Sequence, residues 1–143
     1  MTTVAFRDGV LAADSFATDD SGSIQVCKVA RLPNGDVAGG AGDLGEITQA
    51  LQWLARGSRG KKPAIPNASI LFTIRGVPHL ASGGWPGVPV KGCVAIGSGA
   101  QGALVAMRLG KTAEEAVACV IGVDHCTGGE IEVLAYKRPR KPK

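Results

Sequence analysis

Two turn signals early in the chain constrain its fold more than any other feature. Asp8-Gly9 and Asn34-Gly35 each separate short apolar segments, and such pairs favour the positive-φ geometry of tight β-hairpins. The strands predicted around these turns are Thr2–Phe6, Val10–Asp14, Ile24–Leu32 and Asp36–Gly40. The first quarter of the chain is therefore predicted to form antiparallel sheet.

Helical patterns follow this region. Asp43, with Glu46 three residues later, is an N-cap signal and begins a helix predicted to run to about Arg56. Two later helices are expected, Ser98–Leu109, which ends before Gly110, and a helix that begins with a capping box of Thr112 and Glu115. The further strands predicted are Ser69–Arg75, His79–Ser82, Gly92–Ile96 and Glu130–Tyr136. This pattern by itself predicts an α+β protein.

Composition and length indicate one domain, expected over residues 2–136, with a basic flexible tail over 137–143. The chain has 143 residues and a net charge of +4, and most of the positive balance lies in KRPRKPK at its end. It shows no leader and no apolar run long enough to cross a membrane, so a cytoplasmic protein is expected. Its four cysteines lack CxxC spacing, so we expect reduced thiols and neither a metal nor another cofactor.

Three polar residues suggest a reaction. If Met1 is removed, Thr2 carries both a hydroxyl and a free α-amine, which can act as nucleophile and base on one residue. The α-amine has a reference pKa of about 7.7 to 8.0, and a nearby cation would lower that pKa further. Lys28 could be this cation, and Asp14, in an otherwise apolar strand, could keep Lys28 charged. Taken alone, Asp14 and Lys28 could also be a surface ion pair.

Five motifs in order carry a family resemblance: TTVAFRDGVLAADSFAT, CKVARL, VAGGAGD, VAIGSGAQGA and DHCTGG. Their order resembles that of proteasome β-subunits and the bacterial HslV peptidase, the threonine branch of the N-terminal nucleophile hydrolases. The similarity runs from Thr2 to about Tyr136. It implies a four-layer αββα sandwich.

The resemblance also implies roles for individual residues. The nucleophile falls on Thr2, the lysine and aspartate on Lys28 and Asp14, and the oxyanion-hole glycine on Gly39. The residues implied to support the terminal amine are Ser98, Asp124 and Thr127; Thr127 replaces the family's serine and keeps its hydroxyl. The residues implied to line the pocket for the substrate side chain before the cut are Ala17, Val26, Ala30, Val37, Ala41 and Gly45, all small or apolar.

The stretch GSRGKKPAIPN, residues 57–67, departs from this family pattern. The relatives usually carry a second long helix here, whereas this chain has room only for an exposed basic loop. One helix layer of the sandwich is therefore expected to be shortened. The resemblance implies a ring-forming homo-oligomer fed by an ATP-dependent unfoldase, and the missing helix leaves both features open.

The expected function is a threonine-type endopeptidase that cleaves peptide or protein substrates through an acyl-enzyme. Two alternatives stay open, a catalytically inactive subunit or assembly module and an amidohydrolase that acts on small amides.

Three other patterns are weighed against this expectation. Gly97 to Gly102 satisfies G-x-G-x-x-G but lies late, without a clear parallel strand–helix–strand unit, so its glycines fit a tight turn better than a nucleotide site. The neighbours Asp124, His125 and Cys126 project in different directions and cannot easily converge as a triad. The basic tail has no interleaved aromatic residues to stack bases, which argues against nucleic acid and leaves docking to an acidic partner open.

Overall fold

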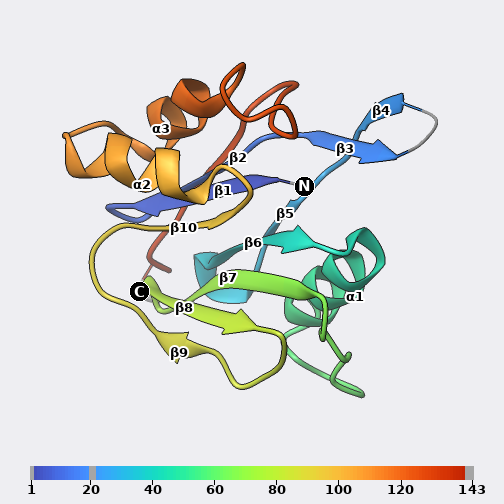
Figure 1. Ribbon diagram of the computed structural model, residues 1–143. Coiled ribbons are helices and arrows are strands. Elements are labelled where there is room, and N and C mark those ends of the chain that lie inside the picture. The colour runs from blue at the N-terminus through green and yellow to red at the C-terminus, as the bar shows by residue number, and fades with distance from the viewer. Residues whose placement is uncertain (1, 20–21, 141–143) are drawn as a thin grey trace.

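The computed structural model describes residues 2–19 and 22–140 and shows a mixed α/β fold with two main sheets (Figure 1). The first sheet has the order β10-β1-β2-β11 and the second the order β5-β6-β7-β8-β9, while β3 and β4 form a separate ribbon. The first sheet and the ribbon consist of β1 (Thr3–Arg7), β2 (Val10–Ala13), β10 (Val94–Gly97), β11 (Glu132–Ala135), β3 (Phe16–Asp19) and β4 (Gly22–Gln25). The second sheet consists of β5 (Val29–Arg31), β6 (Val37–Gly42), β7 (Ala68–Ile74), β8 (Val77–Ser82) and β9 (Val88–Pro89).

Both predicted hairpins are present. Asp8 and Gly9 have φ values of 51° and 79° and join β1 to β2, in the register Val4 opposite Ala13. A short 3₁₀ turn, η1 (Pro33–Gly35), joins β5 to β6 with φ values of 64° at Asn34 and 78° at Gly35. The turn chemistry thus determines which residues face each other across these strands.

The predicted strand Ile24–Leu32 is wrong as a single element. The chain leaves the β3–β4 ribbon after Gln25 and enters the second sheet only at Val29, so Lys28 lies between two strands and not inside one. In this connection the Val26 N–H donates to the Ser15 carbonyl at 2.7 Å, and Gly40 donates to the Lys28 carbonyl at 3.0 Å. The strand β3 was not predicted, because its short sequence FATD shows no clear alternation of apolar and polar residues.

The three predicted helices are confirmed as α1 (Leu44–Ala55), α2 (Ala100–Arg108) and α3 (Ala113–Val120). The Asp43 side chain accepts a hydrogen bond from Glu46 N at 2.9 Å at the start of α1. Thr112 and Glu115 form the complete capping box of α3. Residues 57–67 form no helix, as expected from the two prolines and the basic composition of that segment.

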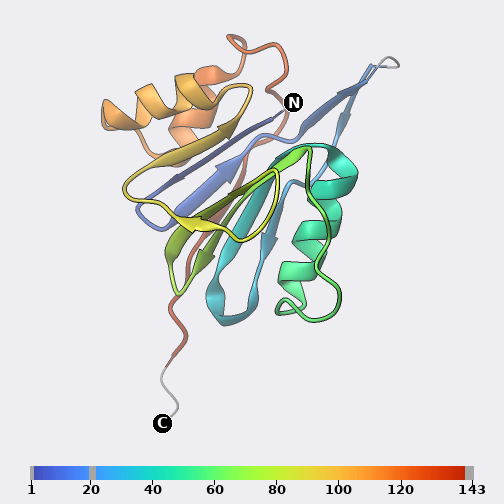
Figure 2. The same ribbon diagram turned by 60° about the horizontal axis from the view of Figure 1, so that its bottom comes forward.

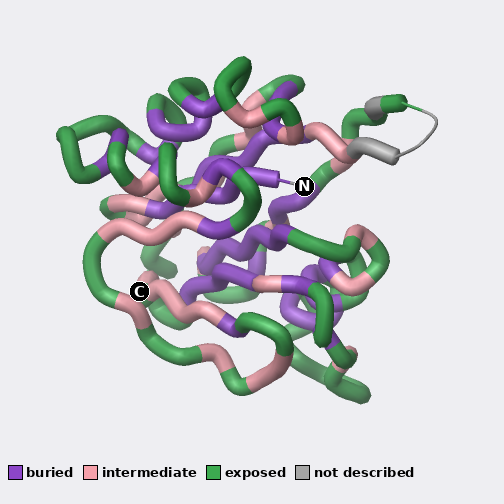
Figure 3. The backbone as a smooth tube through the Cα atoms, in the orientation of Figure 1, coloured by how far each residue is buried: buried purple, intermediate pink, exposed green. Residues whose placement is uncertain are grey.

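The central strands β1, β2, β6 and β7 are buried on both of their faces (Figure 3). Val4 and Phe6 of β1 lie between the two sheets, whereas Ala5 packs against α2 and α3. In β7, Leu71 lies between the sheets and Ile70 packs toward α1. The helices α2 and α3 therefore cover the far face of the first sheet and α1 covers the far face of the second (Figure 2).

The sheet face beside α1 is completed by aromatic side chains. The Trp85 ring lies 5.1 Å from that of Trp53 and 5.8 Å from that of Phe72, measured between ring centroids. The Trp85 indole N–H donates to the Pro63 carbonyl at 2.9 Å and so fixes the loop before β7. Ile65 of the same loop is 1% exposed. The loop before β7 and the Trp85 indole thus cover part of the sheet face against which α1 packs.

Candidate active site

One oxygen of the Asp14 carboxylate accepts three hydrogen bonds at the end of the first hairpin. Asp14 Oδ1 accepts hydrogen bonds from the Thr2 hydroxyl, the Thr3 N–H and the Lys28 ammonium, each at 3.1 Å. The hairpin register explains the first two contacts, because it places the residue after β2 beside the start of β1. The predicted pairing of Asp14 with Lys28 is therefore present, but as a buried contact and not as a surface ion pair.

The second oxygen of Asp14 is satisfied by backbone. Oδ2 accepts from Gly128 N at 3.0 Å and from Phe16 N at 3.4 Å. Asp14 is fully buried, and a buried carboxylate needs this number of donors to remain charged. The carboxylate is thus fixed in position by segments from three parts of the chain.

Lys28 is only 2% exposed, and its ammonium donates to Asp14 and to the Phe16 carbonyl. Burial lowers the pKa of Lys28, because the ammonium loses its hydration, and the charge and hydrogen bond of Asp14 oppose this effect in part. The ammonium and the Thr2 hydroxyl share one acceptor atom, so the positive charge lies next to the candidate nucleophile.

A second polar cluster approaches from the other side of β1. Ser98 and Thr127 each donate a hydroxyl hydrogen bond of 2.5 Å to Asp124 Oδ2. These two bonds, that of Ser98 first, lower the pKa of Asp124. The Thr127 hydroxyl also lies 2.8 Å from the Thr3 hydroxyl, so the cluster reaches the residue that follows Thr2. The sequence predicted Ser98, Asp124 and Thr127 as one group, and the structure brings them together.

Two glycines bring backbone close to this centre. A Cβ at Gly97, whose φ is 99°, would lie 1.6 Å from the Thr2 carbonyl oxygen, so β10 can pass Thr2 only without a side chain. Gly39 lies in β6 opposite Val29 and Leu71, and a Cβ there would contact Val4 at 3.0 Å. Met1, whose removal the sequence analysis requires, lies outside the described residues.

The six residues expected to line a substrate pocket do not share one surface. Val37 is fully buried between the sheets, and Ala30 packs with the cluster under α1. Gly45 is exposed in the first turn of α1, whereas Ala17 and Val26 are partly exposed near the β3–β4 ribbon.

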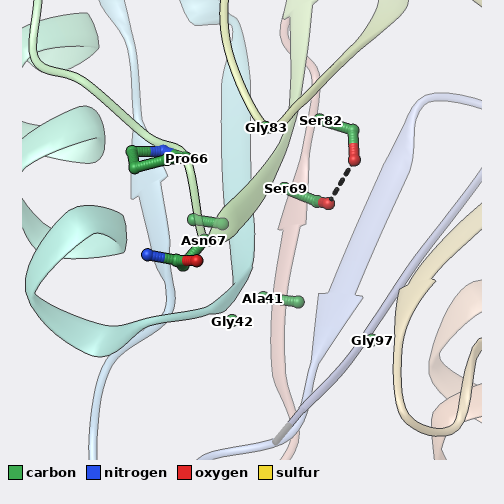
Figure 4. A pocket seen from close by; sticks show the side chains of 9 residues that line it. Ala41, Gly42, Pro66, Asn67, Ser69, Ser82, Gly83 and Gly97 are labelled. Atoms are coloured by element: carbon green, nitrogen blue, oxygen red, sulfur yellow. Dashed lines mark hydrogen bonds between the residues drawn. The ribbon is translucent and has the colours of Figure 1, made fainter.

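Ala41 of this group lines a pocket that also includes Gly97, the neighbour of the Thr2 carbonyl. The pocket has a volume of about 270 Å³ and opens between the ends of β6, β7 and β8, with Gly97 on its far side (Figure 4). The hydroxyls of Ser69 and Ser82, 2.9 Å apart, form part of its wall. The amide oxygen of Asn67 lies on the side of Ala41, since its nitrogen donates to Glu46.

Sequence reasoning missed three contributors to the site. The Thr3 hydroxyl links the two polar clusters, Gly128 donates its N–H to Asp14, and the Phe16 carbonyl accepts from Lys28. Two of them act through backbone groups, which carry no residue-type signal. The threonine pair at the start and the glycine pair Gly128–Gly129 beside Ser15 were the available hints.

No metal site accompanies these clusters in the described part of the chain, where no three His, Cys, Asp or Glu side chains gather. Within the same residues, no helix has the length and apolar character needed to span a bilayer.

Comparison with known proteins finds matches among solved structures and none from sequence. No family model matches the chain, and no curated protein matches it. Solved structures that match include Thiobacillus denitrificans BPH in complex with epoxomicin, with a TM-score of 0.70 and 14% identity over 95% of this chain and 98% of that one. Eukaryotic HslV from Trypanosoma brucei matches with a TM-score of 0.67 and 20% identity over 94% and 98% of the two chains. An Anbu (Gly-1) mutant from Hyphomicrobium sp. strain MC1 matches with a TM-score of 0.73 and 15% identity over 96% and 82%.

These neighbours are proteasome-like N-terminal nucleophile hydrolases. At these identities the likeness shows the fold. The resemblance seen in the sequence motifs is therefore confirmed at the level of the fold.

Proposed function

We propose that the chain is a threonine-type endopeptidase of the N-terminal nucleophile class, with Thr2 as its nucleophile. The observation that carries the proposal is the shared acceptor, because Asp14 Oδ1 holds the Thr2 hydroxyl and the Lys28 ammonium at 3.1 Å each in a buried site. A packing role alone would not require a buried lysine next to a threonine hydroxyl. We also propose that the order of helices and sheets is that of the αββα sandwich, with the α1 layer shortened, in one domain over residues 2–136.

The mechanism requires that whatever precedes Thr2 is removed, so that its amine is free. The Thr2 oxygen then forms a bond to a peptide carbonyl carbon, while its proton moves to the Thr2 amine. The oxyanion collapses, the C–N bond breaks, and the leaving amine takes that proton. An ester to Thr2 remains. Water adds to its carbonyl carbon and gives a proton to the Thr2 amine; the C–Oγ bond then breaks, the amine returns that proton to Oγ, and the acid product leaves.

The neighbouring residues support these steps in different ways. Lys28 holds the Thr2 amine in its neutral form by like-charge repulsion and places positive charge near the developing oxyanion. Asp14 keeps Lys28 charged and fixes the Thr2 hydroxyl. The Gly39 backbone N–H is the proposed oxyanion donor, and Ser98, Asp124 and Thr127 orient the amine through their contact with Thr3.

Substrate and assembly are proposed from the resemblance and from the fold. The substrate is a peptide with an apolar side chain before the cut; this is supported by Ala41, a small apolar residue that lines the pocket beside Gly97, and by the apolar Ala17 and Val26 that the resemblance implies. The proposed assembly is a homo-oligomeric ring in the cytoplasm, with an ATP-dependent unfoldase as a possible feeder. An inactive assembly subunit is the second candidate, and it is favoured by one observation: the Thr2 side chain is only 1% exposed with its hydroxyl held by Asp14.

Intact mass spectrometry tests this proposal. The purified protein is incubated with a peptide epoxyketone, a reagent suggested by the epoxomicin complex of BPH, and the adduct is located by fragmentation. We expect a chain that begins at Thr2 and carries one adduct there. Thr2→Ala should remain unlabelled, whereas Thr2→Ser, which keeps the hydroxyl, should retain labelling.

Thr3→Ser is the matched control, since it keeps a hydroxyl at the neighbouring position and should label like the wild type. A processed wild-type chain that stays unlabelled would favour the inactive subunit. Turnover of small amides without peptide cleavage would favour the amidohydrolase.

A further inference from the structure

A basic groove lies beside the C-terminal half of α1, far from Thr2. It has a volume of about 440 Å³. The groove is formed by α1 and by the loop that follows α1. The residues that line the groove are Gln49, Gln52, Trp53, Arg56, Lys61, Lys62, Pro63 and Ala64. Figure 2 shows α1 and this loop at the side and lower end of the molecule, whereas the N-terminus lies at the upper end.

The loop that forms the groove is held in place at several points. Trp53 donates its indole N–H to the Gly60 carbonyl at 3.4 Å, and Trp85 donates to Pro63 at 2.9 Å. Ile65 anchors the end of the loop in the core under α1. The lysines at 61 and 62 therefore project from a backbone that is tied on both sides, which reduces the entropy lost when a ligand binds.

The groove carries positive charge without internal compensation. Arg56, Lys61 and Lys62 are exposed, and the ion pairs formed by residues 2–19 and 22–140 are Arg7–Asp8 and Lys28–Asp14. Three cations around one concave surface repel each other, and an anionic ligand removes that repulsion. The charge complement of this groove is therefore acidic.

We propose that this groove binds an acidic segment of a partner protein. Its carboxylates would pair with Arg56, Lys61 and Lys62, while the amides of Gln49 and Gln52, one helical turn apart on α1, bond to the peptide backbone. A nucleic acid fits less well, because single-strand sites stack bases on exposed aromatic rings. Trp53 is 8% exposed and its N–H is already used, so the groove offers no such platform.

Fluorescence anisotropy tests the proposal directly. The probe is a fluorescein-labelled peptide of Glu and Gly with a free C-terminal carboxylate, titrated with the full chain at low salt. We expect saturable binding that weakens as salt rises, and a loss of at least ~10-fold in affinity for the double variant Lys61→Glu/Lys62→Glu.

The matched control is Lys91→Glu/Lys111→Glu, which reverses the same number of exposed lysines away from the groove and should bind like the wild type. Circular dichroism melting checks that both variants fold. Three results would overturn the proposal: no saturable binding by the wild type, an equal loss in the control, or tighter binding of a labelled oligothymidylate through the same two lysines.

Discussion

Asp14 and Asp36 are both buried carboxylates with different partners; Asp14 directly follows β2, whereas Asp36 lies between η1 and β6. Asp36 precedes β6 and accepts from the Thr73 hydroxyl at 2.6 Å, from Arg75 N at 3.1 Å and from Gly76 N at 3.0 Å. All its donors are neutral, and two belong to the turn between β7 and β8. Asp14 also accepts from backbone N–H groups and from a hydroxyl, but it has a lysine ammonium as a further donor.

The difference separates a structural carboxylate from a candidate catalytic one. Asp36 shows that this fold can satisfy a buried carboxylate with a hydroxyl and backbone alone. The lysine beside Asp14 is therefore not needed merely to bury a carboxylate, and its own burial lowers its pKa. A chain keeps such a costly group where it serves chemistry more often than where it serves packing.

The largest expected effect comes from Lys28→Met. Peptidase activity should fall by about 10²- to 10⁴-fold, since the variant loses the charge beside the nucleophile and its amine. Asp14 would be left buried without its cation, which should lower the free energy of unfolding by about 3–5 kcal/mol. Steady-state cleavage of a fluorogenic peptide and urea unfolding measure the two quantities.

The double variant Lys28→Met/Asp14→Asn sharpens this result, because it removes both charges together. Stability should return in part, to within about 1–3 kcal/mol of wild type, because the new amide nitrogen would still face a backbone N–H donor, while activity should not return. Full activity in either variant would place the chemistry elsewhere in the molecule.

Asp36→Asn should lower stability and leave activity nearly unchanged. Its new amide group would face backbone N–H donors, so we expect the free energy of unfolding to fall by about 1–3 kcal/mol. Activity per folded molecule should stay within about twofold of wild type, because Asp36 lies at the far end of β6. Urea unfolding and active-site titration provide the comparison. A loss of activity as large as that of Lys28→Met would remove the distinction between the two carboxylates.

The smallest expected effect is that of Ser98→Ala on the pH profile. The Ser98 hydroxyl is the main cause of the lowered pKa of Asp124, so its removal should raise that pKa. The ionised form of Asp124 would then be lost at a higher pH on acidification, and the acid limb of kcat should move upward while the rate near neutral pH falls only a few-fold. Thr48→Ala, which removes a hydroxyl bonded within α1, is the control and should leave the profile unchanged.

Local signals in the sequence predicted most of the secondary structure. Asp8-Gly9, Asn34-Gly35, Asp43 and the Thr112 capping box each determine geometry within a few residues, and each appears as expected. The connection around Lys28 was not predictable in this way. Its path depends on hydrogen bonds to Ser15 and Gly40, which are distant in sequence, and no local preference encodes them.

The same distinction between local and long-range signals applies to the candidate site. Thr2, Asp14 and Lys28 could be proposed from residue type, because side-chain chemistry is visible in a sequence. The backbone donors and acceptors of the site were not visible, since any residue can supply them.

The contact between Asp14 and Gly128 has a kinetic consequence. It spans 114 positions of the chain, and the contact between the Thr3 and Thr127 hydroxyls spans 124. Closing loops of this length is slow compared with forming a hairpin or a helix, so these bonds belong to the late steps of folding. A partly folded chain can hold the first hairpin, with Thr2 close to Asp14, yet lack the hydroxyl contacts of Thr127 with Thr3 and Asp124. Thr2 would therefore become reactive only after the whole chain has folded.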